Sequence, residues 1–266
     1  MKKWMFFTMI ALCATCAMAQ KKSKGSAMKE GQVIAIEEIS GVGGDSDYTV
    51  AAPQASPKFK KYINHTSDYS DDSVKGWHYF EVAYEVGSTG IDKDGAKKPI
   101  LVIPEIEVTY ALLYDMSKSK LASAVKGQAA KAKGAIGWEN PKEMYSLFTT
   151  TITYTTITPK RSHYAAVCLP PSAVAVYGEP IAFSVQIKVD GVQQGNIETV
   201  FKGDAKVAGK SLKDIAYDKN GPCAWWERIE NLTDAVVKRD GILRDRSATP
   251  FALAGDMYYD QVKMDK

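Results

Sequence analysis

The stretch "EIEVTYALLYD", residues 105–115, decides the fold class of this chain. Apolar side chains occupy every second position in it, namely Ile106, Val108, Tyr110, Leu112 and Tyr114. The intervening positions include Glu105, Glu107, Thr109 and Asp115. Successive side chains of a strand point to opposite faces, so this period of two predicts a strand with one face on a core and one in water.

Further stretches repeat the pattern along the chain. Counting them gives about eight strands, at residues 32–39, 47–52, 77–86, 105–115, 146–158, 162–169, 182–189 and 196–201. Alternation favours antiparallel sheets, because parallel strands buried on both faces read as continuous apolar runs. We therefore expect a mainly β protein, an immunoglobulin-like antiparallel two-sheet β-sandwich with short helical insertions and an extended C-terminal segment. An eight-stranded outer-membrane barrel is the alternative, but prolines and long polar loops interrupt the apolar faces it needs.

The turns agree with a sandwich. Asp190-Gly191 and Gly195-Asn196 each follow a strand with the residues that tight hairpin turns prefer. The prolines of residues 168–180 suit a crossover between sheets. We expect an exposed insertion with one or two helical turns at 116–144, one or two short amphipathic helices within 223–242, and an extended tail after them.

The N-terminal residues predict export. Two lysines, an apolar stretch and the small-x-small pattern Ala17-Met18-Ala19 indicate a secretory signal at residues 1–19. The apolar run is shorter than a membrane anchor needs, and no small residue precedes Cys13 or Cys16 as a lipoprotein signal requires. Residues 20–31 read as a flexible tether and 32–266 as a single domain. The expected location is the periplasm, the outer membrane or the cell surface.

The charge balance excludes nucleic acid as a partner. Without the signal, Lys2 and Lys3 are lost from 34 basic residues, which leaves 32 against 31 acidic residues and a formal charge of +1. No later apolar run has membrane length, so we expect a protein that is soluble or peripherally attached to a membrane.

Cys168 and Cys223 are the two cysteines outside the signal. In an oxidising compartment such a pair suggests a disulfide. It would close a loop of about 55 residues and contribute about 4 kcal/mol in the chain-entropy model. The alternative is a pair of buried free thiols that never meet.

The sequence shows no catalytic, metal or cofactor signature. His65, His78 and His163 lie far apart and in no metal-ligand spacing. His78 sits on the apolar face of its strand, where a histidine at the edge of the core is the usual reading. The "DKDG" at residues 92–95 lacks the later ligands of a calcium loop and fits a hairpin turn. We expect no enzyme.

Trp225 and Trp226, in "NGPCAWWERIENL" at residues 220–232, could be a ligand platform or an anchor in the fold. Adjacent helical residues point about 100° apart, so the two rings cannot present one flat surface if helical. We favour the anchor, with the pair pinning the C-terminal part of the chain to the sandwich. Under the platform reading the protein binds glycans, host mucin among them, with Tyr258 and Tyr259 as further aromatic contacts.

Two resemblances complete the interpretation. The stretches at 77–86, 105–115 and 175–191 resemble immunoglobulin-like envelope proteins, although no tryptophan lies between the two cysteines as in antibody domains. The stretches "KGWHYFEVAYEV" (75–86) and "GILRDRSATPFALAGDMYYD" (241–260) are similar to secreted proteins of the type IV pilus-like, outer-membrane-associated gene clusters of Akkermansia-type Verrucomicrobia. This resemblance implies a non-enzymatic role in an envelope or pilus-like assembly, through protein–protein contacts at sheet edges and the tail, and transfers no functional residue.

Overall fold

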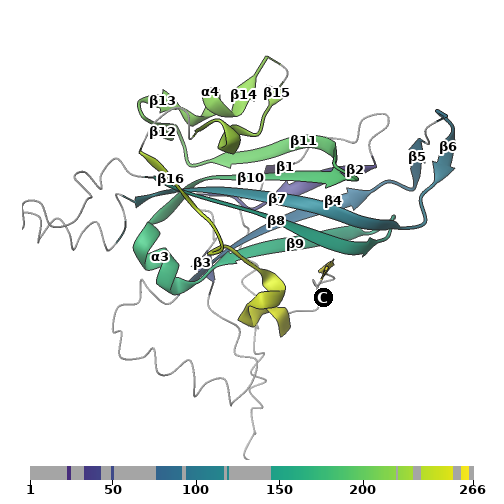
Figure 1. Cartoon of the computed structure of the whole chain (residues 1–266), viewed down its shortest axis with the longest axis horizontal. Coiled ribbons are helices and arrows are strands. Elements are labelled where there is room, and N and C mark those ends of the chain that lie inside the picture. The colour runs from purple at the N-terminus through teal and green to yellow at the C-terminus, as the bar shows by residue number, and fades with distance from the viewer. Residues whose placement is uncertain are drawn as a thin grey trace, which may run out of the picture.

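Two mainly antiparallel sheets form the body of the protein (Figure 1). The computed structural model describes residues 23–24, 33–42, 49–50, 76–91, 94–116, 119, 145–219, 221–229, 235–253 and 259–263. The first sheet has the order β1-β2-β4-β9-β17, with β3 also paired to β4, and the second has the order β11-β10-β7-β8-β16, with β18 also paired to β8. The first contains β1 (Ser23–Lys24), β2 (Ile34–Ile39), β3 (Thr49–Val50), β4 (Trp77–Val86), β9 (Ser162–Leu169) and β17 (Arg244–Asp245). The second contains β7 (Ile103–Asp115), β8 (Tyr145–Ile157), β10 (Glu179–Val189), β11 (Val192–Phe201), β16 (Val236–Arg239) and β18 (Gln261–Val262).

The long strands follow the immunoglobulin-like connection pattern. Taken in chain order as A to G, they are β2, β4, β7, β8, β9, β10 and β11. The first sheet then reads A-B-E and the second G-F-C with the fourth strand beside C, an arrangement within the immunoglobulin-like class. The expected fold class is therefore confirmed.

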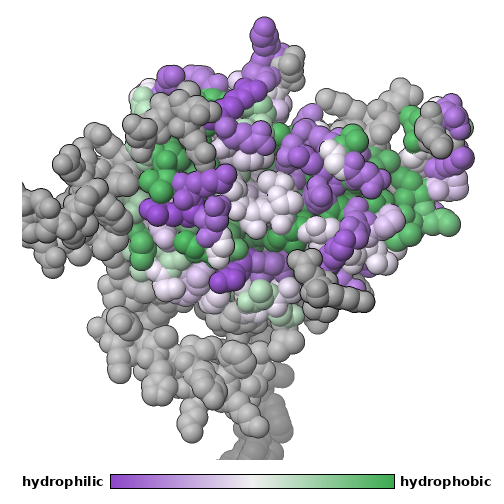
Figure 2. Space-filling view, viewed as in Figure 1, coloured by the Kyte–Doolittle hydropathy of each residue, from purple (hydrophilic) through white to green (hydrophobic). Residues whose placement is uncertain are grey.

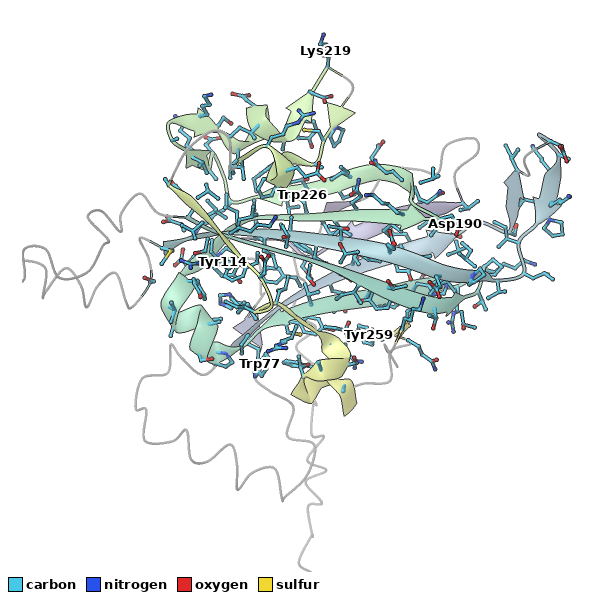
Figure 3. The ribbon with its side chains drawn as sticks, in the orientation of Figure 1. Trp77, Tyr114, Asp190, Lys219, Trp226 and Tyr259 are labelled. Carbon is cyan, nitrogen blue, oxygen red and sulfur yellow. The ribbon has the colours of Figure 1, made fainter. Side chains whose placement is uncertain are left out.

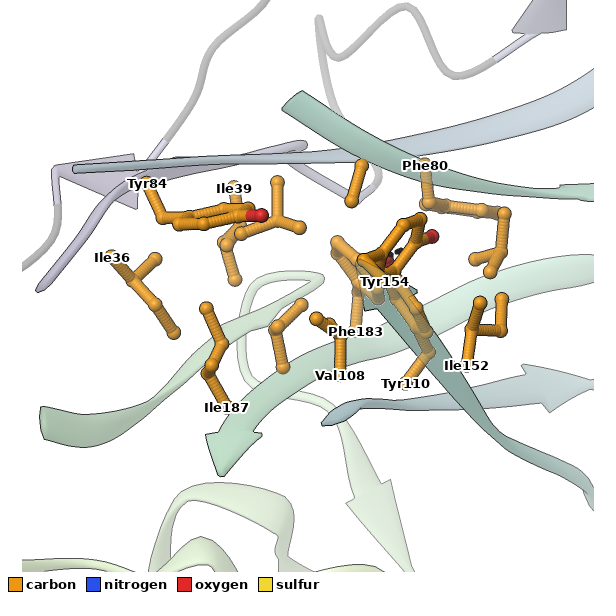
Figure 4. Packing of buried hydrophobic residues seen from close by; sticks show 14 of the residues in the cluster. Ile36, Ile39, Phe80, Tyr84, Val108, Tyr110, Ile152, Tyr154, Phe183 and Ile187 are labelled. Atoms are coloured by element: carbon orange, nitrogen blue, oxygen red, sulfur yellow. Dashed lines mark hydrogen bonds between the residues drawn. The ribbon is translucent and has the colours of Figure 1, made fainter. Parts of the chain in front are cut away.

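The alternating residues build the core between the sheets. Figure 4 shows Phe80 and Tyr84 of the first sheet facing Val108, Tyr110 and Phe183 of the second. All five side chains are fully buried. Strands β4 and β9 have the bounds that the sequence predicts, although β9 is buried at every position from Ala165 to Leu169.

A second hydrophobic cluster covers the outer face of the second sheet. Residues 202–219 and 221–229, here called the covering segment, form β12 (Lys206–Val207), β13 (Lys210–Ser211), α4 (Leu212–Ala216), β14 (Tyr217–Asp218), β15 (Gly221–Pro222) and the 3₁₀ helix η5 (Trp225–Glu227). Its apolar residues pack against Ala111 and Leu113 of β7 and Leu147 of β8. The second sheet is thus buried on both faces in this region.

The C-terminal part of the chain holds the β8 and β9 side of the sandwich. Strand β16 runs parallel to the start of β8, and β17 pairs antiparallel with β9. The 3₁₀ helices η7 (Arg246–Ala248) and η8 (Pro250–Leu253) follow, and β18 returns to β8. The expected tail is therefore laid along the domain, but it is built of short strands and 3₁₀ turns.

Three local predictions need comment. Asp190 and Gly191, with φ of 50° and 75°, make the expected turn between β10 and β11. Gly195-Asn196 is not a second turn; it lies inside β11 at a register shift, where Gly195 takes φ of 67°. Of the one or two helices expected within 223–242, η5 is present, and residues 230–234 lie outside the described residues. The β-branched pair Val236-Val237 is not helical but adds to the edge of β8 as β16.

Two connections behave as expected. Helix α3 (Pro171–Tyr177) carries the chain from β9 in one sheet to β10 in the other, and Pro171 begins it. Strands β5 (Thr89–Ile91) and β6 (Lys97–Pro99), on either side of the "DKDG" stretch, pair as a hairpin, while residues 92–93 of that stretch lie outside the described residues. The expected signal at 1–19 lies outside the described residues, as do most of the tether and of the 116–144 insertion; Ser23–Lys24 within the tether pair with β2.

Candidate functional site

The tryptophan pair is buried between the covering segment and the second sheet (Figure 3). Trp225 has no exposed surface and Trp226 has 6%. Their ring centroids lie 6.0 Å apart with the planes at 82°. Neither ring can stack on a sugar, and the arrangement accords with the anchor interpretation.

One hydrogen bond fixes the orientation of Trp225. Its indole Nε1 donates to Ser184 Oγ on β10 at 2.6 Å. Ser184 Oγ in turn donates to Thr199 Oγ1 on β11 at 2.8 Å. A buried indole N–H needs such an acceptor, so the pair of hydroxyls explains why tryptophan is accepted at this position.

Tyr259 lies on the opposite side of the sandwich from the tryptophans (Figure 3). Its hydroxyl accepts a hydrogen bond from Tyr79 at 2.7 Å and donates to Glu81 at 2.5 Å. The Arg246 guanidinium covers its ring at 3.7 Å from the centroid. Both the ring and the hydroxyl of Tyr259 are therefore engaged within the protein, while Tyr258 lies outside the described residues.

The predicted disulfide is absent, and this corrects the sequence analysis. Cys168 and Cys223 are free and buried. Cys168 lies on β9 of the first sheet, with its Thr249 hydrogen-bond partner in the C-terminal segment. Cys223 lies in the covering segment on the far face of the second sheet and donates to the Ile215 carbonyl. The second sheet separates the two sulfurs, so the pair matches the alternative of free thiols.

We predict that both thiols are unreactive in the native protein and that a reductant leaves the melting temperature unchanged. Burial raises the pKa of Cys168 to about 12, and burial likewise raises the pKa of Cys223. The thiolate is the reactive form, so little of it is present near neutral pH. Labelling with a thiol reagent, mapped to each cysteine by mass spectrometry, should proceed only after denaturant is added. Rapid labelling of either residue in the native state would contradict the burial described here.

Exposed aliphatic residues lie where the β5–β6 hairpin leaves the sandwich. Leu101 is 81% exposed and Val102 43% exposed, just before β7 begins with the buried Ile103. Ile91 in β5 is 46% exposed. Figure 2 shows apolar surface at this end of the molecule, and Figure 1 places the β5–β6 hairpin there. We call Ile91, Leu101 and Val102 the hairpin-end patch.

Strand lengths explain why these residues are exposed. Pairing of β7 with β10 ends at Glu107, whereas pairing of β7 with β8 continues to Ile103. The start of β7 thus projects past β10, and Pro104 there has no N–H to offer a neighbouring strand. Exposed consecutive aliphatic side chains are costly in water and are common at interaction sites.

Sequence reasoning missed this patch. The signal is the run Pro99-Ile100-Leu101-Val102-Ile103-Pro104, because consecutive apolar residues in a two-sided strand cannot all face one core. The sequence also gave no partner for His163, which contacts Asp260 97 residues further along the chain.

The described residues hold neither a metal-ligand cluster nor a membrane-spanning helix. No group of three or more His, Cys, Asp or Glu side chains among them is placed to hold a metal ion. Nor does any helix in the described part of the chain have the length and apolarity to cross a membrane.

Comparisons with known proteins support the fold described above. A protein-family model matches residues 44–266. The crystal structure of a protein from Akkermansia muciniphila superposes with a TM-score of 0.51 at 12% identity, over 92% of this chain and 99% of that one. At that identity the likeness shows a common fold alone. No curated protein matches. Because the family model covers most of the chain, the protein belongs to the family that this model defines, with the fold of the Akkermansia muciniphila structure.

Proposed function

We propose that this chain is a non-enzymatic protein of the cell envelope that acts by protein–protein contact, as a component of or accessory to a pilus-like or outer-membrane-associated assembly. The hairpin-end patch carries the proposal. It presents Leu101 and Val102 to solvent in the segment just before the projecting start of β7, where a partner can cover them without any change in the core. Burying one such aliphatic side chain contributes about 1.5–3 kcal/mol, so a few of them can anchor an interface.

The chemistry of the patch favours a protein as its partner. Its residues are aliphatic and offer no aromatic face on which a sugar ring could stack. Charges of both signs flank it, with Asp94 and Lys97 on the hairpin and Lys160 on the β8–β9 turn. Attraction to an anionic membrane depends on a cluster of basic residues, which the mixture weakens.

The glycan-binding alternative retains less support. Two of its four aromatic residues, Trp225 and Trp226, are buried, and Tyr259 is engaged by Tyr79, Glu81 and Arg246. We keep it as an outcome of the tests and not as a second proposal.

We predict that Leu101→Ser combined with Val102→Ser removes the partners of this protein without unfolding it. Loss of two exposed aliphatic contacts should weaken association about tenfold to a hundredfold, because each exposed side chain contributes only when a partner buries it. Chemical cross-linking in intact cells, followed by purification and mass spectrometry, measures the change. The melting temperature of the purified variant should stay within about 2 °C of wild type, as expected for surface changes.

Tyr217→Ser is the matched control for this experiment. Tyr217 is 45% exposed on β14 of the covering segment, and Figure 3 places its neighbour Lys219 far from the hairpin end. Its substitution should leave the cross-linked set unchanged. An identical set of partners for wild type and the double variant would overturn the assignment of the patch, and recovery of the wild-type protein alone would overturn the assembly role itself. A glycan array and sedimentation with anionic vesicles then examine the other two ligand classes.

A further inference from the structure

Residues 259–263, here called the strap, connect the two sheets along the side formed by β9 and β8. The Asp260 N–H donates to the Tyr164 carbonyl of β9 at 3.1 Å. Directly after it, β18 pairs with β8, and the Lys263 N–H donates to the Thr153 carbonyl at 2.8 Å. Main-chain pairing thus joins the strap to both sheets, and its side chains add to that attachment.

Polar side chains contribute to that attachment beside Val262, which packs against the core. Tyr259 is held by the hydroxyl and carboxylate contacts described above, and Lys263 Nζ lies 2.7 Å from a carboxylate oxygen of Glu105. The Lys263 contact is half-exposed and is therefore weak in water. Asp260 is different, because its side chain is 1% exposed.

The surroundings of His163 and Asp260 determine how many protons this hydrogen-bonded pair must hold. His163 Nε2 lies 2.6 Å from the Thr158 carbonyl oxygen, which can only accept, so Nε2 carries a proton. His163 Nδ1 lies 2.7 Å from Asp260 Oδ1. A hydrogen bond there requires one more proton, on the ring or on the carboxyl group. A singly protonated ring facing an ionised carboxylate would place two lone pairs against each other.

We propose that the His163–Asp260 contact is a proton-dependent latch that holds the strap across the two sheets. With the shared proton in place, the two groups form a buried charge-assisted pair. When it is lost, Asp260 remains as a buried carboxylate with one partner removed, which is strongly unfavourable. The strap then leaves the seam so that the carboxylate can reach water.

The tyrosines around the latch keep their own protons, so the shared proton belongs to His163 and Asp260. Tyr84 of β4 stacks on His163, Tyr110 of β7 interacts electrostatically with Asp260, and Tyr154 of β8 is hydrogen-bonded to Tyr110. Burial holds the pKa of each phenol well above its usual value. Tyr84 therefore remains a donor to Asp260 Oδ2. The charged neighbours are Arg161, 3.9 Å from Asp260, and Asp245, which accepts from Tyr154 at 3.2 Å.

Release of the strap would uncover main-chain groups of both sheets. The carbonyls of Tyr164 and Thr153 lose their donors, and a strand from another chain can take up such groups by adding to a sheet edge. The strap thus covers the edges of β9 and β8 only while the His163–Asp260 pair holds its shared proton.

Hydrogen exchange of the full-length protein, followed by NMR across a pH series, tests the latch. The Asp260 and Lys263 amides report the strap, the central-strand amide of Val108 controls for the pH dependence of intrinsic exchange, and the His163 ring signals report its protonation. In the wild type, protection of the strap should fall about tenfold to a hundredfold relative to Val108 as His163 loses its second ring proton. Strap protection that stays level through that titration would overturn the proposal.

Asp260→Asn separates a latch from ordinary packing. The asparagine amide can donate to Nδ1 of a neutral His163 and still accept from Tyr84, so this variant should keep the strap in place with no shared proton. Its strap protection should therefore stay level through the pH range in which the wild type opens. Asp260→Ala, which offers neither contact, should lose the protection at every pH. The same pH profile in the asparagine variant and the wild type would contradict the role of the proton.

Discussion

Trp225→Ala should lower the free energy of unfolding by about 3–5 kcal/mol, the range for removing a large aromatic side chain from a core. The ring is completely buried in the cluster that joins the covering segment to β7, β8 and β10. Its removal leaves a cavity and also takes the donor away from Ser184 Oγ. Urea unfolding followed by far-ultraviolet circular dichroism measures the loss without relying on tryptophan fluorescence.

Tyr217→Ala is the control for that measurement. It truncates an aromatic residue of the same segment that is 45% exposed, and its cost should stay within about 0.5–1 kcal/mol. A loss below about 1 kcal/mol for Trp225→Ala would mean that the covering segment is not anchored by this ring.

His78 should make the protein less stable as the pH falls from about 6.5 to about 4. Burial lowers the pKa of His78 to about 4, against an opposing effect of Glu179. His78 Nδ1 and the Tyr114 hydroxyl share a hydrogen bond of 2.8 Å, and the two rings are stacked. The unfolded chain binds a proton at a higher pH than the folded chain does. The contribution of His78 to stability is thus complete above the pKa of the unfolded chain, about 6.5. It falls as the pH drops toward the folded-state pKa and is level below about 4, with a total change of about 3 kcal/mol.

His78→Phe removes this titrating group while keeping a ring in the core. The variant pays a roughly constant cost for the lost hydrogen bond, about 1 kcal/mol, so the difference between the two proteins reports His78 alone. That difference should shrink or reverse by about 3 kcal/mol between pH 7 and pH 4 in urea titrations. A difference that is constant over this range would show that the ring is not buried in neutral form.

Local alternation predicts most of the sandwich because a strand with one face in water has apolar and polar residues in turn along its own sequence. Strands β4 and β9 match their predicted bounds, and β7, β8, β10 and β11 differ by a few residues at their ends. The stretch "YALLY" at 110–114 is an exception, because the water-facing side expected for this strand is wrong there. All five residues are buried, since the covering segment packs on Ala111 and Leu113 at the second face of β7.

Long-range contacts explain what the sequence could not predict. The sequence places Val236 and Val237 in a helix, whereas in the structure they pair with the edge of β8. Cys168 and Cys223 appear as a pair in a list of residues, yet a whole sheet lies between them. His163 and Asp260 look unrelated because the strap that joins them is positioned by tertiary structure alone. In each case the missing information is which segments meet in space.

The most direct test of the proposed function is site-specific photo-cross-linking in living cells from position 101. A photoreactive residue in place of Leu101 should link to one or a few envelope proteins reproducibly, whereas the same residue in place of Tyr217 should not. Such a result is what an interaction surface at the hairpin end requires. If position 101 yields no product, or yields the same products as position 217, the hairpin-end patch is not the binding surface and the central claim is wrong.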